Sequence, residues 1–179
     1  EVEHIRSKYS YEEYFYKKSV KGKYEGFIHG FPMTQKKYAW CNKRLKIEPL
    51  QKSQKGGIAY IGIAYDEPQR FGNLNNERIY PLAEYEITEA QARRICEDLD
   101  LLSPIYTQSK RGGCWFCHNQ PKNQLRLLRK NYPEYWKLML KWDNDSPVTF
   151  KPDGTTIHDL DKMFAFEDSQ ISIFDGGER

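Results

Sequence analysis

The cysteine pair Cys114 and Cys117 constrains this chain more than any other feature. A Cys-x-x-Cys spacing lets two thiolates reach one metal ion. Two glycines precede the pair and a predicted helix follows it, so the backbone can curl around an ion while helix amides help to stabilise thiolates. A redox dithiol and simple core packing are the alternatives. We interpret the pair as half of a metal site.

Two further cysteines, Cys41 and Cys96, would complete a set of four thiolates with no cysteine left over. Cys96 belongs to the predicted inward face of a helix that begins at a Thr88-x-x-Gln91 capping box. A buried free cysteine is also a common small core residue. Four thiolates suit either tetrahedral zinc or an iron–sulfur cluster. His118 could replace one ligand, although a surface or capping position is the more ordinary role for it.

Length and composition limit the class of protein. The 179 residues suit one domain with its own core, and 39% hydrophobic residues are too many for a disordered chain. No run approaches the roughly 20 apolar residues of a membrane span, and the first residues contain no apolar secretory segment. We expect a cytoplasmic protein without a membrane segment, in which cysteines more often bind metal or catalyse than form disulfides. Two disulfides are the alternative.

The charged residues are distributed in blocks. Residues 106–142 carry eight Lys and Arg against one Glu, whereas residues 143–179 carry three against nine acidic residues. Residues 1–55 are also basic, and residues 56–105 are acidic. The basic blocks suit an anionic ligand such as a nucleotide or a nucleic acid, and alternating solvated faces are the simpler interpretation.

The strongest strand signal is the apolar run 58–64, which is typical of a strand covered on both faces. It leads into a polar loop of the kind that binds ligands at the carboxyl ends of strands in open α/β sheets. In this loop Asp66 and Glu67 could hold a magnesium ion, and Arg70 could bind phosphate or sulfate. An ordinary polar turn is the alternative. The same two interpretations apply to the basic residues Lys43, Arg44 and Lys46.

Helix-start signals and apolar periodicity predict six helices. They begin near Ser10, Trp40, Thr88, Pro121, Pro133 and Thr156, and the second ends before Pro49. Their predicted inward-facing residues include Ala92, Ile95, Cys96, Leu99, Leu125, Leu128, Tyr135, Trp136, Met139, Leu140, Leu160, Met163 and Phe164. Residues 169–179 are predicted to form an extended tail.

Four motifs resemble, in order and spacing, those of phosphoadenosine phosphosulfate (PAPS) reductase-like proteins, most closely the branch common in phages and bacteria. The motifs are Trp40-Cys41-Asn-Lys-Arg-Leu-Lys46-Ile-Glu-Pro-Leu, Tyr60-Ile-Gly62-Ile-Ala-Tyr-Asp66-Glu67-Pro-Gln-Arg70, Tyr80-Pro81-Leu82-Ala-Glu and Gly113-Cys114-Trp-Phe-Cys117. On this resemblance, residues 1–168 correspond to the C-terminal part of such a domain.

The resemblance implies an α/β fold with a partial Rossmann-like parallel sheet of the adenine nucleotide α-hydrolase (PP-loop) type. A helical C-terminal part would surround the Cys-x-x-Cys site. The resemblance also implies a 4Fe-4S cluster on Cys41, Cys114 and Cys117, with zinc as the alternative metal. Where the family has two adjacent cysteines this chain has Cys41-Asn42, so Cys96 is the expected fourth ligand.

The implied second ligand is an adenine nucleotide or sulfonucleotide, accompanied by magnesium. The residues expected to contact its phosphate or sulfate are Glu67, Arg70, Lys46 and Arg44. The chain has neither the family's Ser-Gly-Gly-x-Asp-Ser phosphate loop nor a cysteine in its tail. We therefore expect the N-terminal half of the domain to have been removed or left out, or to be supplied by another chain.

The departures from the family pattern leave three functions open, and catalytic residues are not assigned. One is sulfonucleotide reduction by an oxidoreductase of sulfur metabolism. Another is adenylation followed by sulfur insertion into a nucleic acid. The third is a non-catalytic zinc-stabilised module that binds nucleic acid or protein through the basic faces between Arg111 and Lys130.

Overall fold

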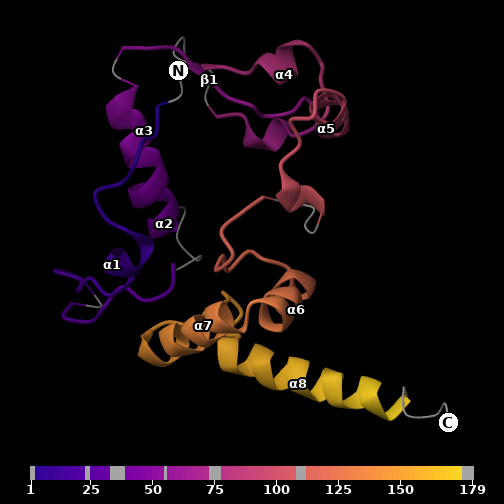
Figure 1. The fold of residues 1–179 in the computed structure, drawn as a ribbon. Helices are drawn as coiled ribbons and strands as arrows, with labels where there is room; N and C mark the ends of the chain where they lie inside the picture. The colour runs from indigo at the N-terminus through magenta and orange to yellow at the C-terminus, as the bar shows by residue number, and fades with distance from the viewer. Residues whose placement is uncertain are drawn as a thin grey trace. The chain divides into compact units, whose positions relative to one another are not determined.

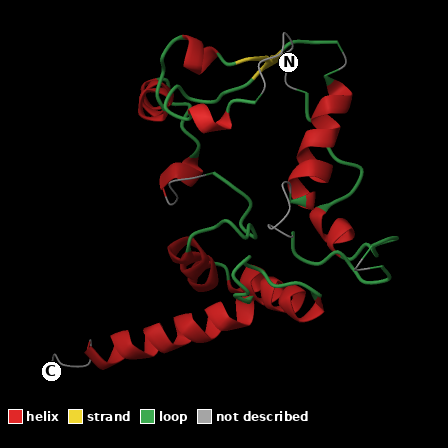
Figure 2. Cartoon of the chain, turned by 180° about the vertical axis from the view of Figure 1, so that it is seen from behind, coloured by secondary structure: helices red, strands yellow, loops and turns green. Residues whose placement is uncertain are grey.

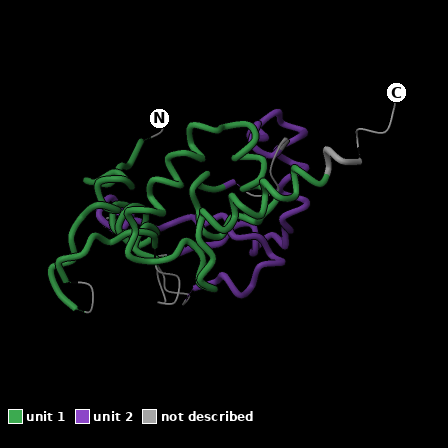
Figure 3. The backbone as a smooth tube through the Cα atoms, turned by 90° about the horizontal axis from the view of Figure 1, so that it is seen from below, with its two compact units in different colours: residues 1–49, 113–179 green, residues 50–112 purple. Residues whose placement is uncertain are grey.

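The structure is a computed structural model that describes residues 3–22, 25–32, 39–54, 56–72, 78–107 and 112–174. The chain divides into two compact units (Figure 3). Unit 1 contains residues 1–49 and 113–179, and unit 2 contains residues 50–112. The fold is α/β, with helices predominating and one small parallel sheet (Figure 2). None of the helices in the described ranges is long and apolar enough to cross a membrane.

Unit 1 begins with the short helix α1 (Tyr11–Phe15). The predicted capping box is confirmed: the Ser10 hydroxyl accepts a hydrogen bond from the Glu13 amide, and the Glu13 carboxylate accepts one from the Ser10 amide. Because these bonds satisfy amides that a helix start leaves free, they fix where α1 begins. The helix buries Tyr14 and Phe15.

A second helical segment begins in unit 1 and continues without a break through α2 (Trp40–Asn42), η1 (Lys43–Ile47) and α3 (Glu48–Ser53), whose residues from Leu50 onward belong to unit 2. The predicted stop before Pro49 is wrong. The η1 segment directly before α3 is a π-helix. Pro49 has no backbone N–H to donate, and the wider turn of the π-helix allows the helix to continue past it. The Arg44 carbonyl in this segment accepts a hydrogen bond from the Ser7 hydroxyl at 3.4 Å.

The C-terminal half of unit 1 consists of three consecutive helices. They are α6 (Lys122–Asn131), α7 (Pro133–Asp145) and α8 (Ile157–Phe174), and they pack against one another (Figure 1). The predicted start of α8 is confirmed, because the Thr156 hydroxyl and the Asp159 carboxylate bond to each other's amides. Since α8 continues to Phe174, residues 169–174 are helical rather than extended, and residues 175–179 lie outside the described ranges.

These helices and α1 enclose the core of unit 1. Its buried residues are Phe15, Phe31, Leu125, Leu128, Trp136, Met139, Trp142, Phe150, Ile157, Leu160 and Phe164. The predicted core positions on α6 and α8 are confirmed, whereas Tyr135 is exposed. The sequence prediction missed Trp142, which lies one helical turn beyond Leu138 on α7.

Unit 2 is built around a two-stranded parallel sheet. Strand β1 (Ala59–Tyr60) pairs with β2 (Arg78–Ile79), with Ala59 opposite Arg78. The predicted strand 58–64 is therefore present but short. Tyr60 is 71% exposed, so the described residues do not cover both faces of this strand. The remaining elements of unit 2 are η2 (Pro68–Arg70), α4 (Pro81–Glu84), α5 (Glu89–Asp98) and η3 (Pro104–Thr107).

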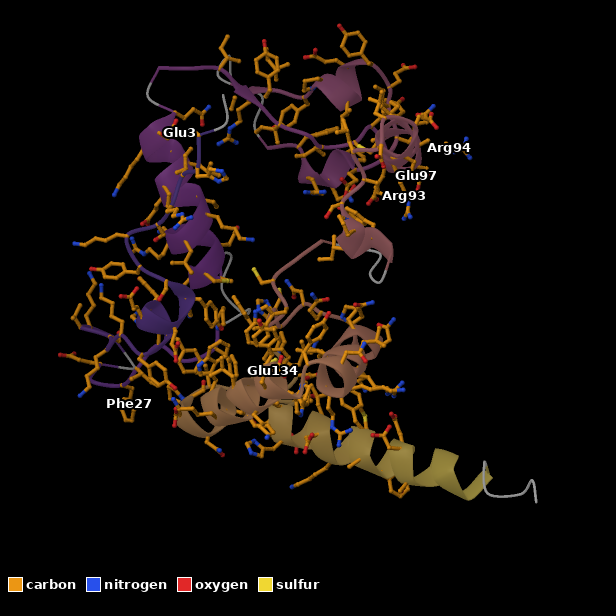
Figure 4. All side chains as sticks on the ribbon, viewed as in Figure 1. Glu3, Phe27, Arg93, Arg94, Glu97 and Glu134 are labelled. Carbon is orange, nitrogen blue, oxygen red and sulfur yellow. The ribbon has the colours of Figure 1, made fainter. Side chains whose placement is uncertain are left out.

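Helix α5 begins at the predicted capping box of Thr88 and Gln91, but its predicted inward face is not buried. Ile95 is 46% exposed and Leu99 is 61% exposed, while Cys96 is partly buried. The periodicity identified an apolar face correctly, yet a short helix buries such a face only where another element covers it. The polar side is exposed as expected, and Arg93 forms an ion pair with Glu97 at 2.8 Å (Figure 4).

Candidate metal centre

The segment that contains Cys114 and Cys117 folds into a tight turn. The Cys117 amide donates a hydrogen bond to the Cys114 carbonyl at 3.0 Å, and the Gln120 amide donates to the Cys117 carbonyl at 2.9 Å. The Gln120 side-chain amide closes the turn by donating to the Cys114 carbonyl at 3.1 Å. Backbone and side chain together therefore fix the path between the two thiols.

Lys151 clamps the residues that follow this turn. Its ammonium donates to the His118 carbonyl at 2.6 Å and to the Gln120 carbonyl at 2.7 Å. The His118 side chain is only 6% exposed, so of the roles considered for it the surface position is wrong, while the capping and ligand roles stay predictions. Burial lowers the pKa of the imidazole, and the charge of Lys151 lowers it further. Sequence reasoning missed Lys151, because no local pattern links it to a turn 31 residues away.

The two residues between the cysteines anchor the turn by aromatic contacts, and both pack on Trp142 of α7. Trp115 stacks on Tyr135 with ring centroids 4.7 Å apart and on Trp142 at 5.7 Å, so it contacts α7. Phe116 packs on Tyr11 of α1 at 4.1 Å. The turn is thus held between helices from the two ends of the sequence.

The third cysteine of unit 1, Cys41, belongs to α2 and lies within electrostatic range of this turn. Burial raises the pKa of its thiol, and the charges of Cys117 and Cys114 raise it further. A backbone hydrogen bond from Asn42 and the charge of Lys46 act in the opposite direction. Ring packing places Cys41 in the same part of unit 1 as the other two thiols, because Trp40, which precedes Cys41, and Phe116, which lies between Cys114 and Cys117, both pack on Tyr11. The π-helix that begins two residues after Cys41 is of a kind found frequently at functional sites.

The fourth predicted ligand, Cys96, belongs to α5 in unit 2, and its role as a ligand stays a prediction. All four cysteines are free thiols. Within the part of the chain that the structure describes, no group of three or more His, Cys, Asp and Glu side chains is arranged to hold a metal ion. The three thiols of unit 1 therefore share a neighbourhood without forming a ligand sphere.

The chemistry around the three thiols nevertheless fits a thiolate-bound metal or cluster. Thiolates are the soft ligands that zinc and iron–sulfur clusters prefer. Lys46 lies near Cys41 and Lys151 lies near Cys117, and both cations offset negative charge there. The Tyr11 hydroxyl, which the charges of all three cysteines reach, is buried without a hydrogen-bond partner. An anionic sulfur site would give this donor an acceptor.

Three of the four residues predicted to contact a nucleotide, Glu67, Arg70 and Arg44, form ion pairs within the chain. Arg70 forms an ion pair with Glu67 at 2.5 Å, and Arg44 forms one with Glu48 at 2.5 Å. The Asp66 carboxylate accepts a hydrogen bond from the Glu89 amide at 3.0 Å and so caps α5. A phosphate group at this loop would have to compete with the Glu67 carboxylate for Arg70. Lys46 is exposed, and its positive charge acts on the Cys41 thiol.

The basic face of α6 is partly neutralised by α8. Arg126 pairs with Glu167, and Arg129 pairs with Asp161 at 2.8 Å and with Asp168 at 2.7 Å. The basic block 106–142 and the acidic block 143–179 thus meet as packed helices. These pairs reduce the charge that α6 can offer to a nucleic acid, and Arg111 at the other end of the predicted basic surface lies outside the described residues.

Comparison with known proteins gives no relative: no protein-family model, curated protein sequence or solved structure matches this chain. The resemblance noted above therefore depends on the four sequence motifs alone.

Proposed function

We propose that unit 1 holds a thiolate-bound metal centre, and that the chain is a PAPS reductase-like protein in which this centre is a 4Fe-4S cluster. The observation that carries the proposal is that the two distant segments carrying the free thiols Cys41, Cys114 and Cys117 pack on one residue, Tyr11. Cys96 is the proposed fourth ligand. Zinc is the alternative metal, since four thiolates suit it equally well.

In this proposal each residue around the thiols has a defined task. The hydrogen bonds of Gln120 and Lys151 hold the Cys-x-x-Cys turn in shape before any metal binds. Lys46 and Lys151 supply positive charge beside Cys41 and Cys117, which would offset the negative charge of thiolate ligands. When bound, a 4Fe-4S cluster would supply one-electron chemistry or electrostatic activation of a neighbouring anion, whereas zinc would stabilise the fold.

We also propose that β1 and β2 belong to a larger Rossmann-like parallel sheet. Parallel strands are normally covered on both faces, and the exposed Tyr60 lacks such cover among the described residues. Further strands would come from a chain segment or partner that supplies the other half of the domain. An adenine nucleotide would then bind at the loop containing Glu67 and Arg70. Sulfonucleotide reduction and sulfur insertion into nucleic acid both follow from this arrangement.

Anaerobic purification followed by metal and sulfide analysis tests the metal centre. We expect a brown protein that contains iron and acid-labile sulfide, and the Cys41→Ser and Cys114→Ser variants should lose both. Stoichiometric zinc without iron would mean that the centre is a structural zinc site and not a cluster. Absence of any bound or reconstituted metal would contradict the proposal. The Cys96→Ser variant decides the fourth ligand: unchanged metal content would make Cys96 an ordinary partly buried residue.

A further inference from the structure

An aromatic cluster in unit 1 contains several polar atoms without partners. Among the described residues, four buried side-chain atoms have no hydrogen-bond partner: the Tyr11 hydroxyl, Nε1 of Trp40, Nε1 of Trp142 and Nδ1 of His29. Leaving such a group unpaired costs about 1–3 kcal/mol, so native structures rarely do so without a reason. All four belong to one connected set of neighbouring, tilted rings. Three of the four, the Tyr11 hydroxyl and the two indole N–H groups, are donors, so their concentration in one place indicates an acceptor that the described side chains of this cluster do not provide.

Tyr11 occupies the centre of this cluster. Its ring lies 5.1 Å from that of Trp40, 4.1 Å from that of Phe116 and 5.2 Å from that of Trp142. Trp40 directly precedes Cys41, and Phe116 lies between Cys114 and Cys117. Tyr11 therefore bridges the two segments that carry the thiols. Its ring is surrounded by apolar neighbours that offer no conventional acceptor to the hydroxyl.

The groups whose charge reaches the Tyr11 hydroxyl are the three cysteines. Burial raises the pKa of Tyr11 most, and negative charge at Cys41, Cys117 and Cys114 raises it further. A tyrosine in these surroundings keeps its proton and remains a donor. Thiolate sulfur is an acceptor, and hydrogen bonds to the sulfurs tune metal–sulfur centres.

We propose that Tyr11 is a positioning residue of the metal centre, and that its hydroxyl donates an O–H···S hydrogen bond to a ligand sulfur when the centre is formed. This inference rests on the proposed function of Cys41, Cys114 and Cys117. It adds Tyr11, from helix α1, to a site whose predicted ligands all lie in other segments of the chain. No bond is formed or broken beyond the hydrogen bond, and the proton stays on the tyrosine oxygen.

The Tyr11→Phe variant tests this role because it removes the hydroxyl and keeps the ring. Cobalt(II) is the probe, since thiolate-to-cobalt absorption reports sulfur ligation directly. We expect Tyr11→Phe to bind cobalt(II) about 10- to 100-fold more weakly than the unmodified chain, which is the usual effect of losing a group that supports a ligand. The metal-free variant should be as stable as the metal-free parent or more stable, because a buried unpaired hydroxyl has been removed.

Tyr16→Phe is the matched control. The Tyr16 hydroxyl already donates to the Asp145 carboxylate at 2.6 Å, so its loss should reduce stability and leave cobalt(II) affinity unchanged. Equal affinity in Tyr11→Phe and the parent would overturn the role of Tyr11 while leaving the metal centre intact. A loss of metal-free stability in Tyr11→Phe as large as that in Tyr16→Phe would also overturn it. If the parent binds no cobalt(II) but contains iron and acid-labile sulfide, the iron and sulfide content of Tyr11→Phe relative to the parent decides its role in the same way. If the parent contains neither metal, the proposed function fails and this inference fails with it.

Discussion

At the scale of single residues, the Cys-x-x-Cys turn depends on a lysine from a distant loop. Lys151 donates to two carbonyls that follow Cys117 in the chain, those of His118 and Gln120. Burial lowers the pKa of the Lys151 amine, and Asp153 and Cys117 act against this effect. Hydrogen bonds from a charged donor are stronger than those between neutral groups. The two bonds from Lys151 therefore hold the turn more firmly than the neutral bonds within the turn itself.

Replacing this lysine should therefore destabilise unit 1. We expect Lys151→Met to lower the free energy of unfolding by about 1.5–3 kcal/mol, because it removes charged hydrogen bonds and leaves carbonyls without donors. Urea denaturation followed by tryptophan fluorescence measures the change. Lys137→Met on the exposed side of α7 is the control and should stay within about 0.5 kcal/mol of the parent. Equal effects of the two substitutions would contradict a clamping role.

The backbone conformation and close packing at Gly30 both favour glycine at this position. Its φ is +64°, and a Cβ atom there would clash with the Ser146 hydroxyl and lie 2.7 Å from Pro147 Cδ. The same Ser146 hydroxyl accepts a hydrogen bond from the Phe31 amide, so it cannot move freely. We expect Gly30→Ala to cost about 2–5 kcal/mol, combining left-handed backbone strain with overpacking.

Gly22 provides the comparison for this substitution. It also has a positive φ, +87°, but a Cβ atom there meets nothing within 4 Å. Gly22→Ala should cost only the backbone strain, about 1–2 kcal/mol. Thermal unfolding of both variants separates strain from crowding, and equal losses would mean that the contact with Ser146 relaxes at little cost.

At the scale of elements, the association of α6 with α8 depends on ionised carboxylates. Asp161 accepts hydrogen bonds from Arg129 at 2.8 Å and from Trp136 at 2.7 Å. Burial raises the pKa of this carboxyl, but the bonds from Arg129 and Trp136 outweigh it, and the pKa is lowered overall. The buried indole of Trp136 thus has its partner on the neighbouring helix.

This arrangement predicts a pH dependence of stability with a definite sign. Because the folded state lowers the pKa of Asp161, its contribution is fully present above the unfolded pKa of about 4 and is lost as the pH falls below that value. Urea denaturation between about pH 6 and about pH 3 should show a steeper loss for the parent than for Asp161→Asn. Asp98→Asn, an exposed position on α5, should keep the parent profile. Identical profiles for the parent and Asp161→Asn would contradict the assignment.

Local sequence chemistry predicted the helix starts, and context determined the rest. The pairs Ser10/Glu13 and Thr88/Gln91 interact over three residues, so their capping boxes needed no tertiary information. The stop before Pro49 was wrong because a π-helical segment accommodates the proline, and no periodicity announces such a segment. The predicted burial of Leu99 was wrong because the apolar face of α5 has no cover among the described residues.

The candidate site was predictable only where its residues form a local sequence pattern. The spacing of Cys114 and Cys117 is a local pattern, and the count of four cysteines added Cys41 and Cys96 as expected ligands. The supporting residues Tyr11 and Lys151 carry no sequence signal of metal binding, since each reaches the site only through the fold. Their roles depend on packing between segments that are more than 30 residues apart in the chain.

At the scale of the whole molecule, apolar burial is concentrated in unit 1. The core of that unit contains aromatic and aliphatic residues from α1, α6, α7 and α8. The described residues of unit 2 bury three hydrophobic side chains, Ile63, Ala64 and Tyr80. Since burying one large side chain contributes about 1.5–3 kcal/mol, the two units differ greatly in the stabilisation available to them.

Unit 2 should therefore open without the unfolding of unit 1. We expect amides in β1, β2 and α5 to exchange with solvent deuterium at least about tenfold faster, relative to their intrinsic rates, than amides in α6, α7 and α8. Hydrogen exchange followed by mass spectrometry of peptic peptides measures both sets in one experiment. Equal protection would mean that the exposed residues Tyr60, Ile95 and Leu99 are covered in solution, as binding of a partner to unit 2 would require. If the amides of unit 2 exchange quickly in the isolated chain and slowly when a binding partner is added, the amides that gain protection identify the face that the partner covers.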